Sequence, residues 1–186
     1  MTAPMGGFYS AEDADDAECM LVRKKEFYDG AIPSGNSVAM LNLIRLSHLA
    51  GNSRYEEKAA HLLRAFSKTI AEAPFAYTQF MTALDFSLGP SSRVVIVGNP
   101  QSGDTMSMIR TLRGSFIPNK VVMIRSAEEH DPEITRLAEY TRDLESIEGK
   151  ATAYVCRDFR CGLPTTDAQQ MLTLLNEGVV SSPVTA

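Results

Sequence analysis

Residues 94–105 read VVIVGNPQSGDT, and this stretch decides the fold of the second half of the chain. Its first four residues are apolar and β-branched, which is typical of a buried strand. The glycines and the proline that follow predict a turn, and Thr105 begins a segment with helical spacing. A strand, a turn and a helix in this order predict the start of an α/β unit.

The turn also resembles a phosphate-binding loop, whose pattern is G-x-x-x-x-G-K-[ST]. Gly98, Gly103 and Thr105 fit this pattern, but Asp104 stands where the loop needs a lysine. A carboxylate repels the phosphates that the lysine ammonium attracts, and Pro100 removes a backbone N–H donor. We therefore expect no nucleotide binding, and we interpret Asp104 as a favourable charge at a helix N-terminus.

Two further short strands are predicted after this helix, at residues 121–124 and 151–155. Helices are expected at 105–113, 132–144 and 167–176, the last with a capping box formed by Thr166 and Gln169. Three strands joined by helical crossovers predict a small three-stranded, mainly parallel sheet. This α/β unit is expected to occupy residues 91–178, and a flexible tail is expected at 179–186.

The chain before residue 91 has helical spacing instead. Residues 36–49 are apolar nearly all round, as in a buried helix. A second helix is predicted to begin with a capping box of Ser53 and Glu56, and it has one apolar stripe and one charged face. A third apolar helix is expected at 75–88. Alternating buried and amphipathic helices over residues 1–90 indicate helical hairpins in two rings, or a plain helical bundle.

The composition is that of an ordinary globular protein, with 44% hydrophobic and 22% charged residues among 186. A net charge of −5 argues against nucleic acid and anionic membranes as partners, because both attract clustered lysine and arginine. No apolar run approaches the ~20 residues of a membrane span. The N-terminal sequence lacks the pattern of a signal peptide, and the acidic residues 12–18 are expected to form a solvated loop. We expect a cytoplasmic protein.

Cys156 and Cys161 lie five residues apart. They could pair or hold a metal, but a C-x₄-C with no second pair is a poor zinc signature, so free thiols at the end of a strand are the favoured interpretation. Arg157 and Arg160 would favour the thiolate form, which keeps redox-sensitive cysteines as an alternative. The three histidines have no metal-ligand spacing, and we predict neither a metal nor a cofactor.

Several stretches of the chain resemble one protein family. They are GGFY at 6–9, LVRKKEFYDGAIPSGNSVAMLNLIRL at 21–46, RYEEKAAHLLRAFS at 54–67, VVIVG at 94–98, PNKVV at 118–122, TAYVCRDFRC at 152–161 and PTTD at 164–167. With these motifs the chain resembles, from about residue 6 to residue 175, the C-terminal part of the spermatogenesis-associated thioredoxin-domain proteins.

The resemblance implies a longer polypeptide, in which a thioredoxin-like domain precedes an (α/α)6 toroid like those of six-hairpin glycosidases and sugar 2-epimerases. This chain would supply the last hairpins of the toroid and a small α/β unit. The expected fold class is therefore α+α/β. The cysteine pair of the thioredoxin-like domain has no counterpart in Cys156 and Cys161.

In such a toroid the pocket lies where the inner helices meet their loops, and carbohydrate chemistry uses paired carboxylates and aromatic platforms. Asp29 is the candidate catalytic carboxylate. The candidate substrate-binding residues are Phe8, Tyr9, Tyr28, Ser34 and Asn36. A purely structural interpretation is equally open, because Asp29 and Gly30 also form an ordinary turn and residues 34–37 are also a good N-cap sequence.

A complete toroid pocket needs carboxylates from several hairpins, and this chain supplies only part of them. We expect the isolated chain to contribute to a pocket for a sugar-like small molecule without being a competent enzyme. The alternative is a non-catalytic interaction or scaffold module with redox-sensitive cysteines. Exposed apolar helix faces would drive self-association, or docking onto the missing toroid and thioredoxin-like parts. We expect that this chain cannot bury all of the following residues: Val38, Leu41, Ile44, Phe80, Met81 and Leu84.

Overall fold

The computed structural model describes residues 6–9, 24–128, 133–157 and 160–177, and it divides the chain into two compact units. The helical unit comprises Met1–Ser47 and Asn52–Leu88, and the sheet unit comprises His48–Gly51 and Gly89–Ala186. The acidic residues 12–18, the start of the helix predicted at 132 and the tail 179–186 lie outside the described residues.

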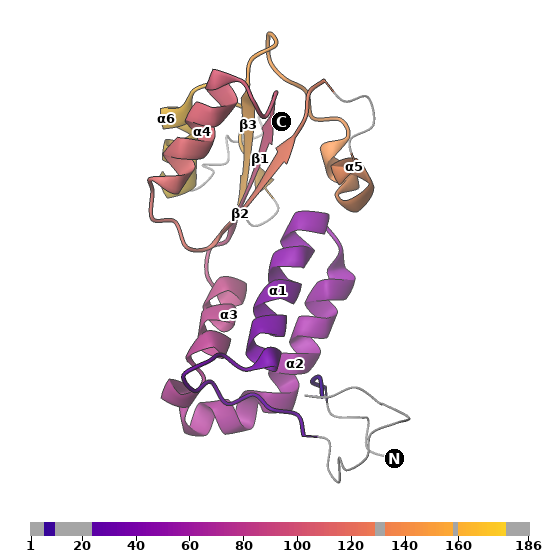
Figure 1. Cartoon of the computed structure of the whole chain (residues 1–186), viewed down its shortest axis with the longest axis vertical. Coiled ribbons are helices and arrows are strands. Elements are labelled where there is room, and N and C mark those ends of the chain that lie inside the picture. The colour runs from indigo at the N-terminus through magenta and orange to yellow at the C-terminus, as the bar shows by residue number, and fades with distance from the viewer. Residues whose placement is uncertain (1–5, 10–23, 129–132, 158–159, 178–186) are drawn as a thin grey trace, which may run out of the picture. The chain divides into compact units, whose positions relative to one another are not determined.

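The described part of the helical unit consists of helices and of two non-helical segments, residues 6–9 and 24–34 (Figure 1). The helices are α1 (Gly35–Ala50), α2 (Ser53–Glu72), the 3-10 turn η1 (Pro74–Ala76) and α3 (Thr78–Leu88). Large apolar side chains from all three α-helices form the core: Met40, Leu41, Ile44, Leu62, Phe66, Phe80 and Phe86. The three helices expected from the helical spacing are therefore confirmed.

Helix α1 is less enclosed than its sequence predicts. Val38 and Leu46 are 38% and 41% exposed, although Leu41 and Ile44 are buried. The expectation of a helix that is buried nearly all round is therefore wrong for this chain. Three helices are too few to enclose one of them on every side.

Helix α2 begins with a different cap from the predicted one. The N-cap is Asn52, whose side-chain oxygen accepts the backbone N–H of Arg54 at 3.0 Å. Its extended backbone (φ −113°, ψ 110°) suits an N-cap, and Ser53 is already the first helical residue. Gly51 follows α1 with a φ of +64°, the left-handed conformation that favours glycine after a helix.

The described residues of the sheet unit form four strands in the order β2-β1-β3-β4. They are β1 (Ser92–Val97), β2 (Lys120–Arg125), β3 (Thr152–Arg157) and β4 (Arg160–Cys161). Strand β2 is parallel to β1, whereas β3 is antiparallel to β1 and β4 is antiparallel to β3. The three predicted strands exist, but the prediction of a three-stranded, mainly parallel sheet is wrong in number and in direction.

The antiparallel direction of β3 agrees with the short helical pieces that connect β2 to β3. The single helix predicted at 132–144 is replaced in the described residues by α5 (Ile134–Leu137) and the 3-10 turn η2 (Glu139–Thr141). An antiparallel β3 starts at the same end of the sheet where β2 ends. A crossover helix along the length of the sheet is then unnecessary, and short pieces are sufficient.

Helices cover both faces of the sheet (Figure 1). One face packs against α4 (Gly103–Arg113) and α6 (Ala168–Glu177), with Val94, Ile96, Val155, Met108, Leu112, Met171 and Leu175 in its core. The other face buries Val95, Val97, Met123 and Ala138 beside α5. Because β1 is buried on both faces, its sequence is a continuous apolar run. The chain is thus a mixed helix and sheet protein.

Cys156 and Cys161 lie opposite each other in the pairing of β3 with β4 and form a disulfide. The favoured interpretation of these residues as free thiols is therefore wrong. Antiparallel pairing places opposite residues within reach of a disulfide. A two-residue strand such as β4 leaves too few residues for a recognisable alternation, so the sequence did not predict this pairing.

Candidate functional site

The segment Gly6 to Tyr9 lies against α2, and its two glycines make this contact possible. A Cβ atom on Gly6 would lie 2.6 Å from the carbonyl oxygen of His61. Gly7 has a φ of +102°, and a Cβ there would lie 2.6 Å from the ring of Phe66. Both positions therefore exclude a side chain, and the close contact sets the positions of Phe8 and Tyr9, whose rings stay about half exposed.

Asn36, at the beginning of α1, fastens this segment to a second extended segment. Its Oδ1 accepts the N–H of Phe8 at 2.7 Å, and its Nδ2 donates to the carbonyl oxygens of Phe8 (3.0 Å) and Glu26 (2.6 Å). Lys25 donates to the carbonyl oxygen of Gly6 at 3.2 Å, and its Nζ lies 4.9 Å from the centre of the Tyr9 ring. The side chain of Asn36 is buried and fully used by these bonds.

A cavity of about 310 Å³ opens beside these residues. Phe8, Tyr9, Glu26, Gly35, Asn36 and Ala39 line it, and we call it the aromatic pocket. Two half-exposed rings provide flat apolar surfaces, and the exposed carboxylate of Glu26 provides hydrogen-bond acceptors. An apolar wall with a few polar groups is typical of a small-molecule site. Three of the predicted binding residues, Phe8, Tyr9 and Asn36, therefore meet at one cavity.

Asp29 does not line this pocket. Its side chain is buried, and one oxygen accepts the N–H of Ser34 at 2.8 Å. The other oxygen accepts the N–H groups of Gln79 (2.9 Å) and Phe80 (3.1 Å) in the first turn of α3. Asp29 thus caps α3 from a distant segment, and the hydrogen bonds of its carboxylate among the described residues come from three backbone N–H groups of the helical unit.

The last two predicted binding residues also lie outside the aromatic pocket. Ser34 caps α1, because its buried Oγ accepts the N–H of Ser37 at 3.2 Å and donates to the Oγ of Ser37. Tyr28 is exposed and packs its ring edge-on against Tyr77, with the ring centres 6.2 Å apart. The capping interpretation of residues 34–37 is confirmed for Ser34.

Sequence reasoning missed three residues that line the pocket, Glu26, Gly35 and Ala39, and it also missed Lys25, which donates to the carbonyl oxygen of Gly6. A signal was available in the alternation of residues 24–29, where Lys25, Phe27 and Asp29 are more buried than their neighbours. Phe27 stacks on Phe66 with the ring centres 4.1 Å apart, which fixes the inward side of this extended segment. The same alternation turns Asp29 inward and leaves Glu26 exposed.

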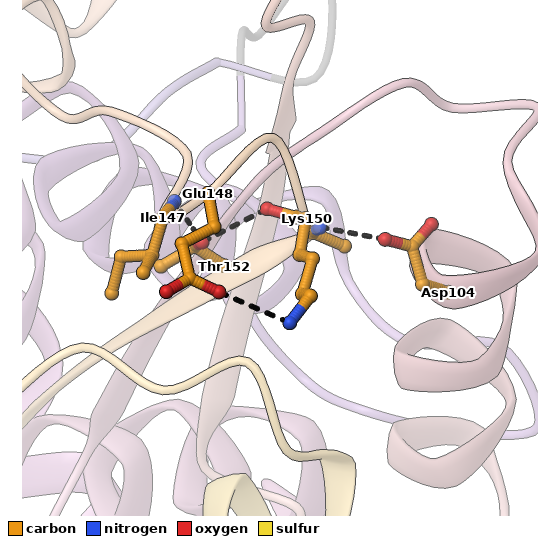
Figure 2. A network of polar contacts seen from close by, with 6 residues as sticks. Asp104, Ile147, Glu148, Lys150 and Thr152 are labelled. Atoms are coloured by element: carbon orange, nitrogen blue, oxygen red, sulfur yellow. Dashed lines mark hydrogen bonds and ion pairs between the residues drawn. The ribbon is translucent and has the colours of Figure 1, made fainter.

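Asp104, at the lysine position of the phosphate-loop pattern, ties α4 to the sheet (Figure 2). One carboxylate oxygen accepts the N–H of Thr105 at 2.8 Å and the hydroxyl of Ser102, and the other accepts the N–H of Ala151 at 2.7 Å. The Ala151 bond, followed by those of Ser102 and Thr105, lowers the pKa of Asp104 from 3.8 to about 2. The negative charge lies in the first turn of α4, as predicted.

A tight turn at residues 147–150 directly precedes Ala151, whose backbone N–H donates to Asp104 (Figure 2). Glu148 and Gly149 both have positive φ values, 51° and 70°, and Lys150 donates its N–H to the carbonyl oxygen of Ile147 at 2.9 Å. The hydroxyl of Thr152 accepts the N–H of Ile147 at 2.8 Å. These bonds fix the turn directly before β3.

The described residues contain no group of three or more histidine, cysteine, aspartate or glutamate residues placed to hold a metal ion. None of the helices described is long and apolar enough to cross a membrane.

The chain is similar to several known proteins over almost its whole length. Spermatogenesis-associated protein 20 of Rattus norvegicus is 32% identical over 174 residues, which are 92% of this chain and 22% of the relative. The protein of the same name from Homo sapiens is 33% identical over 173 residues, again 92% and 22%. An uncharacterised protein of Caenorhabditis elegans is 31% identical over 176 residues, 92% of this chain and 23% of the relative.

The chain therefore spans about a fifth of the length of the curated relatives it matches. No family model matches the sequence, and no solved structure matches it.

Proposed function

Because the chain belongs to the family of the spermatogenesis-associated thioredoxin-domain proteins, we propose that it forms one wall of a binding site for a sugar-like small molecule and is not a catalyst by itself. The wall is the aromatic pocket, and the rest of the site would come from other parts of the longer polypeptide. The observation that carries the proposal is the placement of Phe8, Tyr9 and Glu26 around one cavity.

The chemistry of these side chains fits a neutral, polyhydroxylated ligand. Aromatic rings stack on the apolar face of a sugar ring, and a carboxylate accepts hydrogen bonds from its hydroxyl groups. Asn36 holds the backbone of Phe8 at both its N–H and its C=O, so this part of the backbone needs little ordering on binding. Asp29, the only carboxylate proposed from the sequence for catalysis, already accepts three backbone N–H groups.

Calorimetric titration with D-glucose, N-acetyl-D-glucosamine and maltotriose tests the proposal. We expect weak, saturable binding of at least one of them, and Tyr9→Ala is expected to weaken it about tenfold, which corresponds to about 1.4 kcal/mol. Phe75→Ala is the matched control, because Phe75 is an exposed ring of the same unit outside the pocket. The proposal fails if none of the three sugars binds up to about 10 mM, or if both variants weaken binding equally.

The disulfide favours a second candidate function, a redox-sensitive interaction module. Cys156 is buried and Cys161 is exposed, so an external thiol can reach the bond from the side of Cys161. A small dithiol would break the S–S bond and give two protein thiols, and the dithiol would become a cyclic disulfide. The short strand β4 would then lose its covalent tie to β3.

Amide hydrogen exchange before and after mild treatment with dithiothreitol tests this candidate. In the structure the N–H of Gly162 donates to the carbonyl oxygen of Val155 at 3.0 Å. We expect reduction to remove the protection of this amide, while amides of β1 stay protected. A chain that gains no thiols under conditions where it stays folded would contradict the candidate.

A further inference from the structure

Among the described residues, strand β2 forms the outer edge of the sheet, and the hydrogen bonds at its two ends show which of its backbone groups point outward. The N–H of Ser92 donates to the carbonyl oxygen of Asn119 at 2.8 Å, and the N–H of Gly98 donates to that of Arg125 at 3.0 Å. In a parallel ladder, alternate residues of a strand face the same neighbour. The odd-numbered residues of β2 therefore face β1, and the N–H and C=O groups of Val122 and Ile124 face the open edge.

An apolar groove adjoins this edge. It has a volume of about 380 Å³ and is lined by Ile109, Leu112, Arg113, Lys120, Val122 and Ile124. Val122 and Ile124 pair with Val94 and Ile96 in the parallel register, so they lie on the face that α4 covers. Val94 and Ile96 are fully buried there, whereas Val122 and Ile124 are 39% and 38% exposed. The apolar surface that α4 buries at Val94 and Ile96 thus extends to Val122 and Ile124 at the edge of the sheet, where it is partly exposed and lines the groove.

The charges around the groove are positive, although the chain as a whole carries a net charge of −5. Arg113 and Lys120 both line it. The ammonium group of Lys120 donates to the carbonyl oxygen of Ile117 at 2.9 Å, and burial lowers its pKa. A carboxylate from outside would pair with the exposed Arg113 and with the partly buried Lys120, and partial exclusion of water makes the bond to Lys120 stronger.

A second copy of the chain fits this edge poorly. Strand β2 begins with Lys120 and ends with Arg125. Antiparallel pairing of two copies places outward-facing residues opposite each other, for example Val122 opposite Val122 and Lys120 opposite Ile124. Strand β2 reads KVVMIR and has no acidic residue, so a second copy of it would bring no carboxylate to Arg113 and Lys120. The charges of the groove therefore favour a partner segment that is acidic.

We propose that the outer edge of β2 binds an extended acidic segment of a partner protein, which adds a strand to the sheet. Its backbone pairs with that of Val122 and Ile124, its apolar side chains enter the groove, and its carboxylates lie beside Arg113 and Lys120. This is the strand-addition mode of peptide recognition, in which the main chain gives affinity and alternate side chains give specificity.

The probe is the peptide acetyl-ETVTITVTE-amide, whose glutamate, valine and isoleucine side chains share one face of a strand. We expect saturable binding, seen by amide NMR of the intact chain, and slowed hydrogen exchange of the N–H groups of Val122 and Ile124. The peptide acetyl-KTVTITVTK-amide has the same apolar residues, and we expect it to bind at least about tenfold more weakly at low ionic strength.

Three variants test whether peptide binding depends on the groove and the strand edge or only on the overall charge of the chain. Lys120→Glu leaves one cation, Arg113, beside one carboxylate at the groove, so it is expected to abolish the preference between the two peptides. Arg110→Glu makes the same charge change at an exposed position of α4 outside the groove, and it is expected to leave the preference unchanged. Val122→Pro removes an outward N–H without removing a bond to β1, so the sheet should stay folded while peptide binding is lost.

Four outcomes would overturn the proposal. They are no binding of the acidic peptide to the folded chain, equal binding of both peptides, binding without protection of the Val122 and Ile124 amides, and protection of these amides in a dimer without peptide. The last result would assign the edge to a second copy.

Discussion

At the scale of single residues, two carboxylates hold together segments that are distant in the sequence. Asp29 joins the start of α1 to the first turn of α3, and Asp104 joins α4 to the start of β3. The sequence favoured a charge at the helix N-terminus for Asp104 and left capping at residues 34–37 open beside a binding role. It could not predict the partners Phe80 and Ala151, which lie 51 and 47 residues away, because local patterns carry no information on such contacts.

The structural role of Asp29 predicts a large loss of stability on truncation. Asp29→Ala leaves three backbone N–H groups without their acceptor, and we expect the free energy of unfolding to fall by about 2–4 kcal/mol. Urea unfolding measures this change. Glu57→Ala removes an exposed carboxylate of the same unit and is expected to change it by less than about 0.5 kcal/mol. Equal effects of the two substitutions would contradict the capping role.

The pKa of Asp104 predicts how stability depends on pH. Because this pKa is about 2 in the folded chain and 3.8 ordinarily, the ionised carboxylate stabilises the fold above about pH 3.8. The contribution is lost as the pH falls from 3.8 towards 2. We expect Asp104→Asn to be less stable near neutral pH and to lack this part of the pH dependence. Asp143→Asn, at an exposed carboxylate, should keep it.

At the scale of elements, the spacing of apolar residues predicted the secondary structure of the long segments correctly and that of the short segments wrongly. The three helices before residue 91, the strands β1 to β3 and the helices α4 and α6 follow from apolar spacing. Strand β4 and the pieces α5 and η2 are too short to show a period, so the sequence predicted one continuous helix and a parallel sheet. The capping boxes were misplaced because Asn52 and Asp167 compete with the adjacent Ser53 and Thr166 for the same role.

The cap of α2 can be tested with two neighbouring substitutions. Asn52→Ala removes the oxygen that accepts the N–H of Arg54, and we expect a loss of about 1 kcal/mol in the free energy of unfolding. Ser53→Ala is the matched control and is expected to be close to neutral, because Ser53 lies inside the helix. A larger loss for Ser53→Ala would restore the capping box that the sequence predicts.

At the scale of the whole molecule, the sequence correctly predicted helices first and a helix-covered sheet second. The sequence could not predict which apolar side chains of the helices are buried, because burial depends on which other helices pack against them. Leu41, Ile44 and Phe80 are buried within the helical unit, whereas Val38 and Met81 are 38% and 36% exposed. We propose that these exposed side chains drive self-association, or docking to the rest of the longer polypeptide.

Light scattering at low micromolar concentration measures this association. We expect dimers or larger species, and we expect the double substitution Val38→Ser with Met81→Ser to shift the population towards monomer. Leu137→Ser changes an exposed apolar residue of the sheet unit and should have no such effect. A stable monomer of the unsubstituted chain would show that the helical faces need no partner.

The assignment of the aromatic pocket as the ligand wall is tested most directly by mapping a sugar on the chain. Two-dimensional amide NMR during titration with N-acetyl-D-glucosamine and maltotriose reports each backbone position separately. We predict that the resonances that move are those of Phe8, Tyr9, Glu26, Asn36 and Ala39, which line the pocket, while those of Asp29 and Gln79 stay in place. Shifts centred on Asp29, or no shifts at saturating sugar, would contradict the account.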